Sequence, residues 1–148
     1  WEKKTKRPWN ASLKTLALYK AGESFVKFQN HEKQFYGKFY VDRKKLEHER
    51  NQAGLYKEQA EKILATKNFK KVFSEDPNKL TPYEVYLSGK LPDGHIHARA
   101  RRYAAKIFLS HYQAVAYEIE FGEPAPMPYI IAIGGHKDFI PIPNWPMK

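Results

Sequence analysis

The strongest constraint on the fold is the stretch 93–122, which has the pattern of one long amphipathic helix. Asp93 can cap its first turn by accepting a hydrogen bond from a backbone N–H, and Gly122 can end it in a left-handed conformation. Between these signals, apolar residues recur at the spacing of a single helix face. They are Ile96, Ala100, Tyr103, Ala104, Ile107, Phe108 and Val115. We expect this helix to pack on the core and to organise the rest of the chain.

Basic residues of the same stretch predict a cationic surface on the helix. Four residues follow one another at intervals of four, three and four positions, namely His95, Arg99, Arg102 and Lys106. At helical spacing their side chains line up roughly opposite the apolar face. A helix that is buried on one side and cationic on the other is suited to a negatively charged ligand. We therefore predict that Arg99, Arg101, Arg102 and Lys106 contact phosphate.

Composition narrows the class of protein. The chain has 148 residues, enough for one domain with a core of its own. Its 26 Lys and Arg against 16 Asp and Glu give a net charge of +10, which favours nucleic acid, an anionic membrane surface or an acidic protein as partner. The alternative is that the lysines only keep the protein solvated. The absence of cysteine excludes a disulfide scaffold, a thiolate zinc site and a cysteine nucleophile.

The sequence lacks the signals of a membrane-spanning or secreted protein. No apolar run approaches the ~18 residues needed to cross a bilayer, and no signal peptide is recognisable. We therefore expect an intracellular protein, whether cytoplasmic, organellar or particle-associated, with no membrane partner.

Two further basic clusters extend the predicted binding surface. Residues 1–9 have no apolar period and are interpreted as an extended arm, with Lys3, Lys4, Lys6 and Arg7 available to phosphates. A frayed terminus is the alternative for this arm. Lys70 and Lys71, next to Phe69, form a second candidate contact, although a charge run is commonly just a solvated face.

The first half of the chain predicts helices around one strand. Asn10 or Ser12 is expected to cap a helix that stops at Gly22. Residues 34–41 are rich in aromatics and indicate a strand, with Tyr36, Lys38 and Tyr40 on one face as a possible base-stacking platform. The alternative is that these aromatics belong to the core. Residues 43–67 indicate a helical hairpin broken near Gly54, its first arm facing solvent.

A helix–turn–helix order precedes and includes the long helix. Thr81, Pro82 and Glu84 have the spacing of a capping box and begin a short helix that ends near Ser88. A turn, the basic helix and a possible hairpin then follow in the order of a winged helix–turn–helix, in which Arg99 and Arg102 would contact DNA and Lys137 would lie on the wing. The long turn and the great length of the second helix oppose this analogy.

The C-terminal segment has a different composition. Six of the ten prolines lie in the last 25 residues, so this part is expected to run extended rather than helical. Residues 129–133 indicate a buried strand, 134–135 a turn, and 139–140 a possible return strand restricted to a sheet edge by the prolines that follow.

Catalytic alternatives rest on isolated residues. His95 and His97 lie two positions apart and would diverge on a helix, and no established metal-binding spacing occurs. A metal-dependent enzyme acting on nucleic acid through His95, His97 and Glu118 is one alternative. Another is a tyrosine nucleophile on the long helix. The three candidates are Tyr103, Tyr112 and Tyr117. We assign no catalytic residue, no metal site and no cofactor.

Together these patterns predict a mainly α (α+β) protein with a small β element. We expect a basic arm at 1–9, a mostly helical domain at 10–122, and an extended proline-rich tail with a possible β-hairpin at 123–148. The function predicted first is non-catalytic binding of RNA or DNA within a larger assembly, such as a ribonucleoprotein with other protein subunits. A nucleic-acid-processing enzyme and a structural protein-interaction module are the alternatives.

Overall fold

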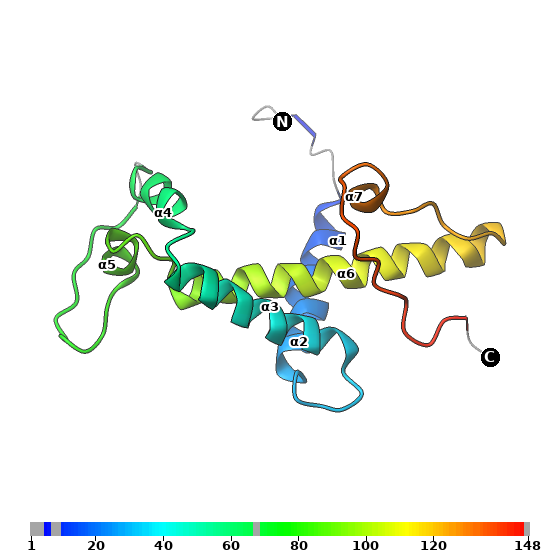
Figure 1. Cartoon of the computed structure of the whole chain (residues 1–148), viewed down its shortest axis with the longest axis horizontal. Coiled ribbons are helices and arrows are strands. Elements are labelled where there is room, and N and C mark those ends of the chain that lie inside the picture. Colours follow the sequence, from blue (N-terminus) through cyan, green and yellow to red (C-terminus); the bar gives the residue numbers. More distant parts are fainter. Residues whose placement is uncertain (1–4, 7–9, 67–68, 147–148) are drawn as a thin grey trace. The chain divides into compact units, whose positions relative to one another are not determined.

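The computed structural model describes residues 5–6, 10–66 and 69–146, and these residues form a mainly helical protein (Figure 1). The elements in chain order are α1 (Ala11–Thr15), the π-helix η1 (Leu16–Ala21), α2 (Gly22–Lys27), α3 (Phe35–Gln52), α4 (Lys57–Leu64), α5 (Pro82–Leu87), α6 (Asp93–Phe121) and α7 (Tyr129–Ala132). The prediction of a mainly α protein is confirmed. The predicted small β element is wrong, because the described residues contain no strand.

The chain divides into two units. Unit 1 comprises residues 1–40 and 101–148, and unit 2 comprises residues 41–100. Two helices, α3 and α6, contribute residues to both units, so each unit is described below by its own contacts.

Helix α6 spans the stretch that the sequence predicts, with Asp93 as its first helical residue and not as the residue before it. It covers Asp93–Phe121, and Gly122 follows with φ 71°, the left-handed conformation expected at a helix end. Its predicted apolar face is buried at Ile96, Ala100 and Ala104, each with no exposed surface.

Unit 2 is built around a small aromatic core. Tyr56 and Ala60 from the start of α4, Tyr86 from α5, and Leu91 and Ile96 at the start of α6 are buried together. Helices α4 and α5 lie side by side in this unit (Figure 1).

The capping box of α5 is confirmed. The Glu84 N–H donates to the Thr81 hydroxyl, and the Glu84 carboxylate accepts from the Thr81 N–H at 2.7 Å. The predicted break near Gly54 is also present, with φ 74° at this glycine between α3 and α4.

The core of unit 1 contains three mutually packed rings. The ring centroids of Phe25 and Tyr36 lie 5.0 Å apart, and that of Phe108 lies 5.5 Å from Phe25 and 5.4 Å from Tyr36. Such separations are typical of favourable aromatic packing. These contacts join α2, α3 and the unit 1 part of α6.

The first helical region begins where predicted but does not stop at Gly22. Asn10 caps it by accepting a hydrogen bond from the Leu13 N–H at 2.9 Å. The helix then continues through η1 and α2 to Lys27, so the predicted stop is wrong. Gly22 allows a close approach here, because a Cβ atom on it would lie 3.1 Å from Cγ of the Arg101 side chain.

The strand predicted at 34–41 is a helix instead. Residues 35–41 form the first two turns of α3, where the ring centroids of Phe35 and Phe39 lie 5.2 Å apart, an i,i+4 contact of a helix. Gly37 allows α3 to approach the backbone that follows α2, since a Cβ atom at position 37 would lie 2.8 Å from the Cα of Gln29. Tertiary packing therefore overrides the strand preference of the aromatics.

The prediction of a β-hairpin in the C-terminal segment is also wrong. Residues 129–132 form α7, a single helical turn, and no strand follows it up to residue 146. The chain after α7 instead crosses α6 (Figure 1), and the carbonyl of Ile140 accepts from Nε2 of His111 at 2.9 Å. Nε1 of Trp145 donates to Glu118 at 2.8 Å.

Candidate nucleic-acid interface

Arg99, predicted to contact phosphate, is bound to a carboxylate of its own chain. Its Nε donates to Oε2 of Glu47 at 2.5 Å, and its Nη1 donates to Gln59 at 3.2 Å. The guanidinium also lies over the ring of Tyr56, 4.6 Å from the centroid. The side chain is 26% exposed. The expectation that it projects from a solvent-exposed cationic face is wrong.

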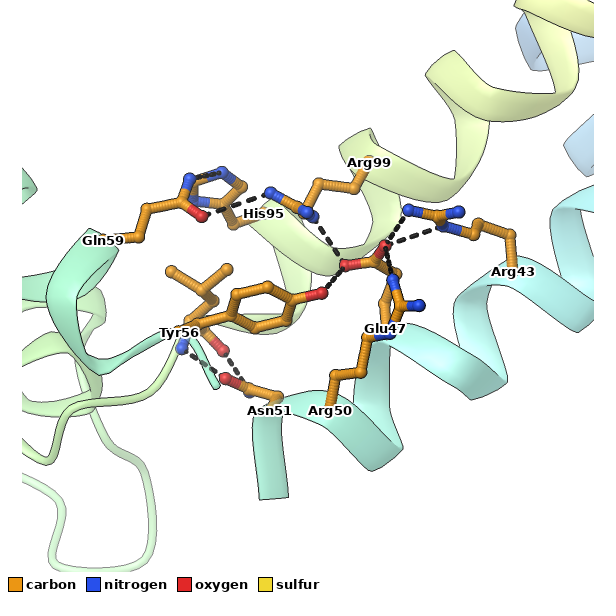
Figure 2. A network of polar contacts seen from close by, with 9 residues as sticks. Arg43, Glu47, Arg50, Asn51, Tyr56, Gln59, His95 and Arg99 are labelled. Atoms are coloured by element: carbon orange, nitrogen blue, oxygen red, sulfur yellow. Dashed lines mark hydrogen bonds and ion pairs between the residues drawn. The ribbon is translucent and has the colours of Figure 1, made fainter. Parts of the chain in front are cut away.

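Glu47 is the centre of a polar network in unit 2 (Figure 2). Its side chain is fully buried, and Tyr56 donates to Oε2 at 2.5 Å while Nε of Arg43 donates to Oε1 at 2.7 Å. Arg50 reaches Oε1 at 4.0 Å. One buried carboxylate is thus surrounded by three guanidinium groups, counting Arg99.

The hydrogen bonds explain why Glu47 remains ionised. Burial raises the pKa of Glu47, but the hydrogen bonds from Tyr56, Arg99 and Arg43 outweigh burial and hold the pKa below its usual value. One turn further along α3, Asn51 is bonded in both directions to the backbone of Leu91, at 2.9 and 2.8 Å. The network therefore joins the end of α3 to the start of α6.

Arg101 is likewise engaged within unit 1. It forms an ion pair with Glu23 and lies 5.2 Å from the ring centroid of Tyr19. Its side chain is 15% exposed, and among the described residues its Nε has no hydrogen-bond partner. The absence of a side chain at Gly22 leaves room for it. The expectation that Arg101 shares a solvent-facing side of the helix is therefore wrong as well.

Arg102 and Lys106 are the two predicted α6 residues that are exposed. They lie one helical turn apart, at i and i+4, and so can present two positive charges in the same direction. Both belong to unit 1. They remain candidates for phosphate contacts.

The second basic cluster lies in unit 2, between α4 and α5. Lys70 and Lys71 are both exposed there. Of the predicted N-terminal arm, Lys6 is exposed. Lys3, Lys4 and Arg7 lie outside the described residues.

The predicted stacking face at Tyr36, Lys38 and Tyr40 does not form. Tyr40 is 2% exposed. The Tyr36 hydroxyl lies 3.0 Å from Nδ1 of His111, and burial raises the pKa of Tyr36. In a helix these three positions no longer share a face. The alternative, that the aromatics belong to the core, is the one the structure supports.

The residues of the metal-dependent alternative form no metal-binding cluster in the described part of the chain. No group of three or more His, Asp or Glu able to hold a metal occurs in residues 5–6, 10–66 and 69–146. His95 lies 3.1 Å from the hydroxyl of Tyr86 in unit 2, whereas Glu118 accepts from Trp145 in unit 1. Lys137 does not lie on a wing, because no hairpin forms in this part of the structure.

Sequence reasoning missed Glu47, since the charge run from residue 43 to 50 was interpreted as a solvent-facing arm. The spacing of Arg43 and Glu47 at i,i+4 was a usable signal of a local ion pair. Arg99, the other arginine that donates to Glu47, lies 52 residues after Glu47 in the chain. No local pattern reveals such a contact.

Comparison with known proteins adds no relationship. No family model, no curated protein and no solved structure matches this chain. In the part of the chain that is described, no helix is both long and apolar enough to cross a membrane.

Proposed function

We propose that this protein binds nucleic acid as a non-catalytic component of a larger assembly. The observation that supports the proposal best is the exposure of two basic pairs, Arg102 with Lys106 on α6 and Lys70 with Lys71 before α5. The net charge of +10 supports it as well. Lys6 is a further exposed basic residue.

Arg99 and Arg101 have a different part in this proposal. Both are committed to carboxylates of the same chain, at Glu47 and Glu23. They position α6 rather than contact phosphate. The exposed pairs act as point charges on the phosphate backbone, which gives binding without sequence readout.

The test is a fluorescence anisotropy titration of the whole chain with labelled oligonucleotides at several salt concentrations. Binding should weaken steeply with salt, with a slope of about −0.9 per neutralised phosphate on duplex and about −0.7 on single strands. The double variant Arg102→Gln, Lys106→Gln should reduce that slope by about one to two such increments. The pair Lys70→Gln, Lys71→Gln should do the same.

Lys62→Gln is the matched control. Lys62 is also an exposed lysine of a helix, but its Nζ donates to Glu58 at 2.5 Å. Its removal should leave the salt slope close to that of the wild type. Absence of binding at low salt, or binding that salt does not weaken, would refute the proposal.

A second candidate is a structural module that binds another protein. Large apolar residues are exposed throughout the region from α7 to the chain after it, namely Tyr129 at 71%, Ile133 at 71% and Phe139 at 53%. Exposed apolar surface of this kind is typical of interaction sites. The double variant Tyr129→Ser, Ile133→Ser should lose a native partner in co-purification while oligonucleotide affinity stays unchanged.

A further inference from the structure

Phe73 is an exposed aromatic side chain on a fixed segment of unit 2. It is 65% exposed and lies in the connection between α4 and α5. Both of its neighbours are hydrogen-bonded to the capping box of α5. The carbonyl of Val72 accepts from the Thr81 hydroxyl at 2.7 Å, and the Ser74 N–H donates to Glu84 at 3.3 Å. The backbone on either side of Phe73 is therefore held, while its side chain faces solvent.

Aromatic packing continues inward from Phe73. Its ring meets that of Tyr83 edge to face, with centroids 5.3 Å apart. The ring of Phe69 lies 6.3 Å from Tyr83 and 5.4 Å from the buried Tyr86. Phe73 is thus the outermost member of a set of rings that reaches the unit 2 core. This packing limits the ring's freedom before any ligand arrives, which lowers the entropy cost of binding.

The two lysines that precede Phe73 favour the approach of a negatively charged ligand. Lys70 and Lys71 precede it and are exposed. Glu75 and Asp76 follow it on the opposite side in sequence and keep their negative charges, and Oδ1 of Asp76 accepts from the Asn78 N–H at 2.9 Å. A ligand with negative charge can approach from the lysine side, and its planar part can cover the ring.

We propose that Phe73 stacks on an unpaired base while Lys70 and Lys71 contact the adjoining phosphates, so that the ligand class of this surface is single-stranded nucleic acid, RNA or DNA. This inference rests on the proposed nucleic-acid binding and specifies it. Alternating aromatic rings and cationic side chains are the means by which single strands are bound without sequence preference. A base within a duplex has its faces covered by its neighbours and cannot stack on Phe73.

The experiment compares the binding of single strands and of duplex to the chain of 148 residues. Labelled oligo(U) and oligo(dT) of about 15 nucleotides, the upper range of one binding module, are titrated beside a duplex of the same length at equal salt. Phe73→Ala should weaken single-strand binding by about fivefold or more, the loss expected for one stacked base. Duplex binding should change by less than about twofold, because the phosphate contacts remain.

Two further variants keep the test decisive. Leu80→Ala is the control, since Leu80 is an equally exposed apolar residue of the same connection, at 67%, without a ring. It should bind as the wild type does. Phe73→Trp preserves a stacking surface and should retain affinity, with quenching of its added fluorescence when oligo(U) or oligo(dT) binds.

The outcomes separate the two proposals. Unchanged single-strand affinity in Phe73→Ala, together with no quenching in Phe73→Trp, would overturn the stacking site yet leave salt-dependent binding by the lysines intact. Absence of any binding by the wild type would overturn both. Equal losses on single strand and duplex would also count against base stacking, because only the unpaired base offers its face.

Discussion

Arg99 donates from Nε to Oε2 of Glu47 at 2.5 Å, and the carboxylate that receives this bond has no exposed surface. The two residues come from α6 and α3, so the contact fixes one helix against the other within unit 2. An ionised group buried in this way is stable only with its partners in place. The position predicted to contact phosphate therefore serves the fold.

Glu47→Gln should destabilise unit 2 strongly. The substitution keeps the shape of the side chain but removes the negative charge shared by Arg43 and Arg99, which then face each other uncompensated. Removing one member of a buried pair costs about 3–5 kcal/mol, and the lower end applies here because both guanidiniums keep a quarter of their surface exposed. Urea denaturation followed by circular dichroism measures the free energy of unfolding.

Glu58→Gln is the matched control for that measurement. Glu58 also pairs with a basic residue at i,i+4, Lys62, but both side chains are more than 70% exposed. Exposed pairs contribute little because water already solvates both charges. A loss of stability in Glu58→Gln as large as in Glu47→Gln would show that burial is not what makes the Glu47 contact important.

Tyr56→Phe should lower stability in a pH-dependent way. The Tyr56 hydroxyl donates to Glu47 at 2.5 Å and helps to hold the Glu47 pKa below its usual value. A hydrogen bond to a charged group contributes about 1.5–3 kcal/mol, so the loss at neutral pH should be of that order. The ring remains in place beneath Arg99.

The sign of the pH effect follows from the lowered pKa. Between the usual carboxyl pKa and the lowered one, the unfolded chain binds a proton that the folded chain does not, so the stability supplied by Glu47 is lost as the pH falls through this interval. The difference between wild type and Tyr56→Phe should therefore narrow below about pH 4. Urea denaturation of both proteins at a series of pH values checks this prediction. It would be contradicted if the difference in unfolding free energy between wild type and Tyr56→Phe grew as the pH fell.

Local signals account for the parts of the fold that the sequence predicted. The capping box at Thr81 and Glu84 and the glycine after α6 act within a few residues, so their patterns identify them directly. The long apolar period of α6 is equally local in origin. Helix α6 carries the candidate residues Arg102 and Lys106.

Long-range contacts account for what the sequence did not predict. Residues 34–41 have the composition of a strand, yet their helix is favoured by ring packing between Tyr36 and Phe108 and by the close approach at Gly37. The exposure of a basic residue depends on partners in the same way. Arg99 and Arg102 are alike in sequence, yet Arg99 is partly buried against a carboxylate 52 residues away in the chain and Arg102 is exposed. Spacing along a helix cannot distinguish them.

His111 should make the stability of unit 1 fall as the pH drops. The Ile140 carbonyl can only accept, so Nε2 carries the proton and Nδ1 accepts from the Tyr36 hydroxyl, which places a neutral imidazole at this site. Burial lowers the His111 pKa, against the opposing effect of the Ile140 hydrogen bond. Below about pH 6.5 the unfolded chain binds a proton that the folded chain does not, so stability decreases until the lowered pKa is reached.

His111→Gln checks this prediction. Glutamine can still donate to the Ile140 carbonyl but does not titrate, so the variant should lose the part of the pH dependence that His111 supplies below about pH 6.5. Urea denaturation across this range measures it. NMR titration of the imidazole in the wild type is the second readout, and a His111 pKa at or above its usual value would contradict the prediction.

Gly37→Ala should destabilise unit 1 although alanine is the better helix former. The helical preference would stabilise α3 by about 1 kcal/mol. A Cβ atom at position 37, however, would lie 2.8 Å from Cα of Gln29 and 3.1 Å from the carbonyl oxygen of Phe25, both of them backbone atoms that cannot move without displacing the turn after α2. Overpacking of this kind costs about 1–3 kcal/mol, so we expect a net loss of stability in thermal unfolding.

Gly94→Ala is the matched control, because a Cβ atom on this glycine in the first turn of α6 meets nothing within 4 Å. It should leave stability unchanged or raise it by up to about 1 kcal/mol. If the two variants were equally stable, the close approach at Gly37 would not be the reason that glycine occupies this position.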